Sequence, residues 1–212
     1  MRTLILTIVL FALVPLSAHA QGAAQIEFYP LKVGHRWTYR ATDIRQKSDQ
    51  RREVVIQVDR EEPYLQPVKK GEETVMEKRV GCLLKSTSVN KMTFDHVVVL
   101  EEGVHRIHSA GTKIDPPLKF IQRPLNVGDT WKCNSLSGNV TLKGTFTTKT
   151  DSIRVPLGIF DRALWIAYRG ESQEARLEID YWFVSGIGMV KQRVLAADHE
   201  IMLELEKFEP AK

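Results

Sequence analysis

The stretch "RLEIDYWF", from Arg176 to Phe183, alternates apolar and polar side chains along most of its length. Four apolar side chains share one face of the extended chain, namely Leu177, Ile179, Tyr181 and Phe183, while the opposite face carries Arg176, Glu178 and Asp180. A period of two residues is typical of a β-strand with one face in the core and the other in water. Half-buried strands of this kind characterise antiparallel sheets, so the segment predicts an antiparallel β protein.

The same alternation occurs in other segments, and no long helical pattern competes with it. It is clear in "EVVIQVD" (53–59), "VTLKGTF" (140–146) and "HEIMLELE" (199–206). We expect roughly ten to twelve strands joined by short turns. The stretches 61–73, 114–119 and 155–161 contain proline and glycine and are predicted to be loops or breaks. The predicted fold is all-β, with curved antiparallel sheet arranged as a half-barrel (clam) or as a sandwich.

A motif of the form Pro-Leu-x-Val-Gly-x-x-Trp occurs twice, at 30–37 and at 124–131. Its proline suits the first position of a strand, its glycine suits a tight turn, and its tryptophan suits a ring packed in the core. They are Pro30, Gly34, Trp37, Pro124, Gly128 and Trp131. A later pair of turns, at Gly103 and at Gly186 with Gly188, extends the similarity weakly. We therefore predict two related β units, at 21–119 and 120–212, packed as one domain.

The N-terminal segment has the pattern of a cleavable secretory signal. One charge at Arg2 precedes an apolar run from Leu4 to Leu16, and small residues end at Ala20, so residues 1–20 are interpreted as a signal peptide. A membrane anchor is the alternative, but the apolar run is shorter than the roughly 20 residues that span a bilayer. The mature chain is then expected to be secreted or periplasmic, without a transmembrane segment.

The charge of the chain does not indicate nucleic acid as a partner. There are 30 Lys and Arg residues against 26 Asp and Glu residues, a surplus of 4 that loses Arg2 when the signal is removed. No strong basic cluster accompanies this mild excess.

Cys82 and Cys133 are the only cysteines of the chain. Because an exported protein meets oxidising conditions, the two could form a disulfide. The alternative is a pair of buried free thiols that pack as small apolar residues. Sequence spacing leaves both alternatives open.

No pattern in the sequence identifies a catalytic, metal or cofactor site. His105 and His108 are three residues apart, which places them on opposite faces of a regular strand unless a bulge intervenes, so a shared metal is not expected. A hydrolase would require at least two of Glu101, Asp95, His96, His105 and His108 to converge in a cleft. Sequence spacing does not favour that convergence, so the chain is predicted not to be an enzyme and to need no cofactor.

Trp182 interrupts the alternation of the opening stretch, because it falls on the polar face with Glu178 and Asp180. An exposed aromatic ring at this position could mark a ligand or partner surface. Alternatively, another strand or a loop covers the ring.

The segments "YPLKVGHRWTY" (29–39) and "YWFVSGIGMVK" (181–191) together resemble exported bacterial β proteins of the TapB-like kind. The matching positions are Pro30 to Trp37 and Trp182 to Gly188, and no catalytic residue comes with them. The resemblance implies a curved antiparallel sheet related to the half-barrels that carry lipids or lipoproteins across the periplasm. A carrier role on this basis is an analogy of fold.

Two functions follow as hypotheses. The first is an exported, non-enzymatic protein of the cell envelope that binds an apolar ligand or a lipoprotein-like partner in a concave sheet; it predicts an apolar cavity of at least roughly 300 Å³. The second is a structural or assembly module that acts through surface contacts with an envelope protein, around Trp182. A hydrolase is the least favoured alternative.

Overall fold

Twelve strands and no helix make up the part of the chain that the computed structural model describes, which is residues 28–45, 52–197 and 199–212. In chain order they are β1 (Arg36–Asp43), β2 (Arg52–Lys70), β3 (Glu73–Ser88), β4 (Lys91–Leu100), β5 (Gly103–Ser109), β6 (Thr112–Gln122), β7 (Thr130–Ser137), β8 (Val140–Val155), β9 (Gly158–Ser172), β10 (Ala175–Val184), β11 (Gly188–Ala196) and β12 (His199–Glu209). The prediction of an all-β fold is confirmed. The predicted signal peptide lies outside the described residues, within which no helix could span a membrane.

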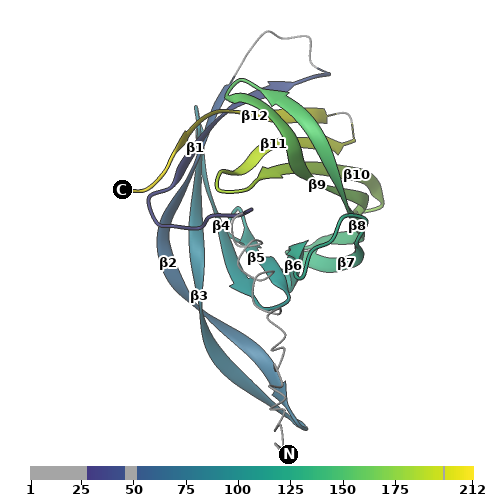
Figure 1. Cartoon of the computed structure of the whole chain (residues 1–212). Coiled ribbons are helices and arrows are strands. Elements are labelled where there is room, and N and C mark those ends of the chain that lie inside the picture. The colour runs from purple at the N-terminus through teal and green to yellow at the C-terminus, as the bar shows by residue number, and fades with distance from the viewer. Residues whose placement is uncertain (1–27, 46–51, 198) are drawn as a thin grey trace, which may run out of the picture.

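The strands form one antiparallel sheet that closes into a barrel (Figure 1). Each strand pairs with the next one along the chain, and β1 pairs with β12 from Arg36 with Glu209 to Asp43 with Ile201. The curvature expected from the sequence therefore continues further than in a half-barrel, until the first and last strands meet. Closure pairs β1 with β12, which would be the two edge strands of an open sheet.

The junction between β6 and β7 is short. It consists of two residue pairs, Ile114 with Ser137 and Asp115 with Leu136. Six strands precede this junction and six follow it, and the two copies of the repeated motif stand directly before β1 and β7. The two related units, at 21–119 and 120–212, stay a prediction with which this arrangement is compatible.

The β2–β3 hairpin projects from the barrel as a two-stranded arm (Figure 1). β1 pairs with β2 only over 52–57, and β4 pairs with β3 only over 81–88, so residues 63–80 pair with each other alone. The sequence predicts a loop at 61–73, and this is wrong, because strand pairing continues to Lys70. Pro63 and Pro67 are tolerated since both edges of the arm are unpaired and a missing N–H can face an edge.

The other two predicted breaks have different outcomes. Residues 155–161 contain the turn between β8 and β9, as expected. In contrast, β6 runs through 114–119, although its residues 114–117 have no partner on β5. The sheet is therefore continuous at this point but locally irregular.

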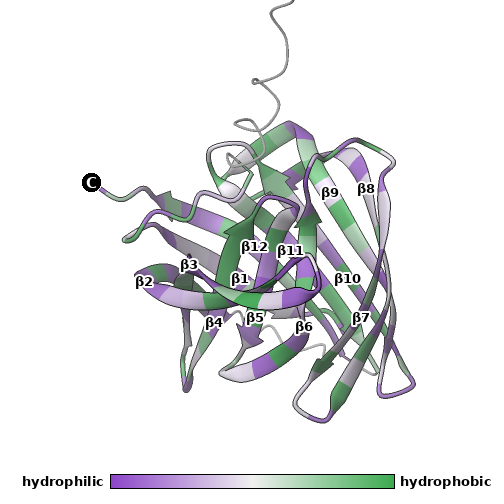
Figure 2. Cartoon of the chain, turned by 90° about the horizontal axis from the view of Figure 1, so that it is seen from below, coloured by the Kyte–Doolittle hydropathy of each residue, from purple (hydrophilic) through white to green (hydrophobic). Residues whose placement is uncertain are grey.

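Hydrophobic and hydrophilic residues alternate along the strands, with the core inside the barrel (Figure 2). Between β7, β8 and β9 the interior is filled by aromatic rings: Trp131 stacks on Phe146 with 5.2 Å between ring centroids, and Phe146 lies 5.0 Å from Tyr168. Stacked and tilted rings of this kind bury large areas and fix one another's position. This side of the barrel interior is therefore packed with ring contacts.

The outer face of β10 is less exposed than its alternation predicts. Glu178 and Asp180 are only 8% and 3% exposed. The Arg169 guanidinium contacts the Asp180 carboxylate at 2.7 Å, and the Arg193 guanidinium contacts it at 3.2 Å. The expectation of a wet face is thus wrong here, because arginine side chains from β9 and β11 cover the carboxylates.

Candidate functional site

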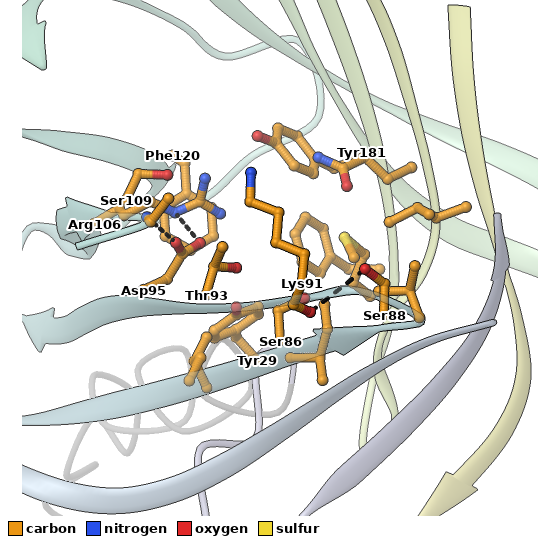
Figure 3. Close-up of a pocket in the computed structure, with 18 residues that line it drawn as sticks. Tyr29, Ser86, Ser88, Lys91, Thr93, Asp95, Arg106, Ser109, Phe120 and Tyr181 are labelled. Carbon is orange, nitrogen blue, oxygen red and sulfur yellow. Dashed lines mark hydrogen bonds and ion pairs between the residues drawn. The ribbon is translucent and has the colours of Figure 1, made fainter. Parts of the chain in front are cut away.

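A cavity of about 390 Å³ lies inside the barrel, on the side away from the aromatic stack of β7 to β9 (Figure 3). Its walls come from β2 to β6 and β10 to β12, with Tyr29 added from the segment before β1. Alternate residues of a strand contribute, such as Ser86 and Ser88 of β3 and Lys91, Thr93 and Asp95 of β4, as follows from the period of two.

One part of the wall is apolar. It consists of residues from β2, β3, β6 and β10 to β12, namely Val54, Ile56, Leu84, Phe120, Phe183, Met189 and Leu203. Aliphatic and aromatic side chains from several strands that face one cavity provide a surface for the hydrocarbon part of a ligand.

The other part of the wall is polar and belongs to β3, β4 and β5. Besides hydroxyl groups it carries three charged side chains, Lys91, Asp95 and Arg106. In Figure 3 the Lys91 side chain extends into the cavity between the Arg106–Asp95 pair and Tyr181. The cavity is therefore amphipathic, with its charges gathered on one side.

Arg106 is held by two neighbours. Its Nε lies 3.4 Å from Oδ2 of Asp95, and its guanidinium carbon lies 5.3 Å from the centre of the Phe120 ring. Asp95 is fixed in turn, because its Oδ1 accepts a hydrogen bond of 2.9 Å from the backbone N–H of Ala110. A cation over a ring face and beside a carboxylate is stabilised by both. The Nε of Arg106 nevertheless has no hydrogen-bond partner and is buried.

Burial and the charge of neighbouring groups shift the pKa values of these side chains in opposite directions. Burial alone would lower the pKa of the Arg106 guanidinium, but the Asp95 carboxylate and the Tyr181 and Tyr29 phenols raise it overall, so the cation persists. Burial raises the pKa of the Tyr29 and Tyr181 phenols, although the nearby Arg106 charge opposes that effect. Both phenols are therefore neutral hydrogen-bond donors at neutral pH.

The repeated motif lies outside the cavity and makes the same backbone contacts in both copies. Gly34 and Gly128 both have φ of 94°, a conformation that favours glycine. The N–H of Gly34 donates to the carbonyl of Val58, and the N–H of Gly128 donates to the carbonyl of Thr148, each at 2.9 Å. These bonds tie each motif to the second strand after it, which is a structural function.

The indole of each motif tryptophan forms a hydrogen bond with the backbone of the other predicted β unit. The indole N–H of Trp37 donates to the carbonyl of Ile187 at 2.6 Å, and that of Trp131 donates to the carbonyl of Lys119 at 2.8 Å. Gly188 approaches Trp37 so closely that a Cβ atom there would lie 3.3 Å from the indole nitrogen. The remaining motif positions, Pro30, Pro124 and Gly186, do not line the cavity.

Trp182 lies on the outer face of β10 and is covered. Its ring stacks on Trp165 with 5.9 Å between centroids, and its N–H donates to Asp151 at 2.9 Å. The Lys191 ammonium lies 5.6 Å from the ring centre, and only 8% of Trp182 is exposed. Of the two interpretations of Trp182, an exposed ring or a ring covered by other residues, the second describes this arrangement.

Cys82 and Cys133 are free, buried thiols in the structure. Cys82 Sγ donates to the carbonyl of Leu31 at 3.5 Å, and Cys133 Sγ donates to the carbonyl of Leu142 at 3.6 Å. They belong to β3 and β7, which three other strands separate in the ring. Of the two alternatives, the structure therefore contains the packed thiols and not the disulfide.

The residues weighed for a hydrolase are dispersed. Asp95 alone among them lines the cavity. His96 lies 3.9 Å from Glu62, His105 lies 3.5 Å from Glu102, and neither histidine faces Asp95 across the cavity. A register shift between Arg106 and His108 brings the ring of His108 onto that of His96, with 5.9 Å between centroids. Within the described ranges, no group of three His, Cys, Asp or Glu residues is arranged to hold a metal.

Sequence reasoning missed Lys91 and Arg106 of the cavity and considered Asp95 only as a residue of a hydrolase. A signal was present, since Asp95 alternates with Val97 on β4, and Arg106 alternates with Val104 on β5. A charged residue in register with buried valines indicates an inward-facing polar group. The adjacent histidines, His96 and His105, drew attention to the opposite face instead.

No family model matches this sequence, and no curated protein matches it significantly. Two solved structures are similar in fold. One is a candidate lipoprotein from Parabacteroides distasonis, with a TM-score of 0.49, 14% identity, and coverage of 86% of this chain and 98% of that chain. The other is a candidate exported protein with a YmcC-like fold from Bacteroides fragilis, with a TM-score of 0.46, 14% identity, and coverage of 87% and 99%. The resemblance to TapB-like proteins stays a prediction.

Proposed function

We propose that this chain is an exported, non-enzymatic protein that binds a small molecule with an apolar body inside its barrel. The observation that carries the proposal is the cavity of about 390 Å³ with an apolar wall. Its volume falls within the range of roughly 300 to 1,000 Å³ that is usual for small-molecule sites.

The construction of the barrel supports this proposal. A barrel whose only role is structural can fill its interior with side chains, as the rings of Trp131, Phe146 and Tyr168 do between β7 and β9. On the opposite side, seven apolar side chains face an open space instead. An apolar surface left uncovered inside a protein loses the free energy that contact with a ligand would provide.

The alternative of a surface module around Trp182 has less support, because other side chains already cover the ring. Recognition of an envelope protein through that residue would require the stacked pair with Trp165 to separate. Binding inside the barrel requires no such rearrangement.

The test uses an uncharged fluorescent probe, N-phenyl-1-naphthylamine, with the purified mature protein. We expect saturable enhancement of its fluorescence with one site per chain. Ile56→Trp, which places a large ring in the cavity wall, should abolish the signal. Ile159→Trp is the matched control, since Ile159 is 58% exposed and does not line the cavity.

Thermal denaturation of both variants establishes that they fold. Equal probe binding by a folded Ile56→Trp variant and the wild type would show that the probe does not occupy the cavity, and the proposal would then fail. Absence of any probe binding to the wild-type protein would have the same meaning.

A further inference from the structure

We infer that the ligand of this cavity is a single-chain amphiphile with an anionic head group, which Arg106 and Lys91 bind on the polar wall. The inference rests on the proposed function and specifies the chemistry of the ligand. Its basis is the juxtaposition of two cationic side chains and one carboxylate around the same cavity.

The charges that line the cavity do not balance. Lys91 and Arg106 are positive, and Asp95 is the single acidic residue of the lining, which leaves one excess positive charge. Asp95 already contacts Arg106 at 3.4 Å and accepts the backbone N–H of Ala110. The Lys91 ammonium forms no ion pair with any residue that the structure describes, although its side chain points into the cavity (Figure 3).

Arg106 has remaining capacity to bind an anion. Its Nε lies 3.4 Å from the Asp95 carboxylate, and its guanidinium presents four further N–H donors. Contact with Phe120 and Asp95 holds the group in place before any ligand arrives. A fixed guanidinium suits carboxylate or phosphate oxygens, because two parallel hydrogen bonds can form at once.

Neutral donors surround the two cations. Four hydroxyl groups line the same wall, those of Ser86, Ser88, Thr93 and Ser109, and the phenols of Tyr29 and Tyr181 face the same space. Hydroxyl groups can donate to an anion and adjust their orientation to it. The wall therefore offers many donors and a single carboxylate, which favours a negatively charged group over a positive one.

The volume limits the size of the ligand. At about 30 Å³ for each water-sized group, 390 Å³ holds about 13 such groups. This matches a chain of roughly ten carbons with its head group, and the cavity is too small to hold both chains of a lipid with two long acyl chains. The head group would lie against β4 and β5, and the chain against Met189, Leu203 and Ile56.

Calorimetric titration of the mature protein with four decyl probes tests the inference. The probes are decanoate, decyl phosphate, decanol and decyltrimethylammonium, each below its micelle concentration. We expect both anions to bind, decanol to bind at least about tenfold more weakly, as loss of one charge-assisted contact implies, and the cation to bind weakest. The ratio of decanoate to decyl phosphate affinity distinguishes a carboxylate ligand from a phosphate ligand.

Two lysine variants, one inside the cavity lining and one outside it, provide the matched comparison. Lys91 is exposed at the start of β4, so Lys91→Met should fold normally and weaken decanoate binding about tenfold without changing decanol binding. Lys132→Met is the control, because Lys132 is an exposed lysine of β7 outside the cavity. It should leave both affinities unchanged.

Two results would overturn the inference. Equal affinities for decanoate and decanol, or an unchanged decanoate affinity in Lys91→Met, would show that the charged wall does not recognise the head group. The proposed function would survive either result if N-phenyl-1-naphthylamine still bound to the cavity. Failure of all four decyl probes and of the naphthylamine would remove both.

Discussion

Asp95→Asn should destabilise the fold by about 3 kcal/mol, because it leaves the Arg106 cation inside the barrel without a counter-charge. At the observed separation of 3.4 Å the attraction is about 5 kcal/mol for an effective dielectric constant of about 20. The side chains of Arg106 and Asp95 keep 20% and 27% exposure, so water in the cavity compensates for part of this loss. Asparagine retains a carbonyl oxygen for the N–H of Ala110, which confines the change to the charge.

The assay is urea unfolding followed by the fluorescence of the four tryptophans. With an m-value of about 2 kcal/mol/M, the midpoint should fall by about 1.5 M. Removal of both charges in Asp95→Asn with Arg106→Met should cost less than the sum of the two single changes, since neither charge then remains unpaired. An Asp95→Asn midpoint within about 0.2 M of the wild type, or strictly additive costs, would refute the reasoning.

Three further predictions concern the scaffold. Gly128→Ala should cost about 1 to 2 kcal/mol from backbone strain alone, because φ is 94° and nothing lies within 4 Å of the added Cβ; an unchanged melting temperature would contradict this. Burial lowers the pKa of His96 and His105 below the ordinary 6.5, so the unfolded chain binds protons first and stability should fall as pH drops below about 6.5. His105→Gln should reduce that pH dependence of stability in urea titrations. The same pH dependence in the variant and the wild type would contradict a contribution from His105. Burial raises the pKa of both the Cys82 and the Cys133 thiols, so 5,5′-dithiobis(2-nitrobenzoate) should label them only on unfolding, and rapid labelling of folded protein would count against the packing.

The class of fold can be predicted from the sequence because apolar and polar residues alternate along each strand and so distinguish its buried face from its exposed face. The alternation of Leu177, Tyr181 and Phe183 predicts an inward face, and all three are buried. Closure of the sheet has no such local signal, since it depends on pairing between Arg36 and Glu209 at opposite ends of the chain. Short-range patterns predict strands, but they do not predict which distant strands meet.

The two prolines of the arm illustrate a second limit. Pro63 and Pro67 predict a break, because proline removes a donor from a central strand. Among the described residues, no third strand pairs with residues 63–80 of the arm, so the missing N–H groups are tolerated. Whether proline ends a strand thus depends on the number of neighbours that the strand has, which the sequence around the proline does not reveal.

Strand pairing determines whether a cation that follows a turn glycine faces the cavity. Arg106 and Lys191 each stand three residues after a turn glycine, Gly103 and Gly188. Arg106 faces the cavity, whereas Lys191 lies over the outward ring of Trp182 and contacts Glu204 at 3.4 Å. Arg106 keeps the regular alternation of β5 with the buried Val104, whereas the pairing of β10 with β11 shifts between Trp182 and Phe183 and leaves Val190 unpaired. Because a shift of one residue moves a side chain to the other face of a sheet, similar sequence in the two halves produces an inward cation in one and an outward cation in the other.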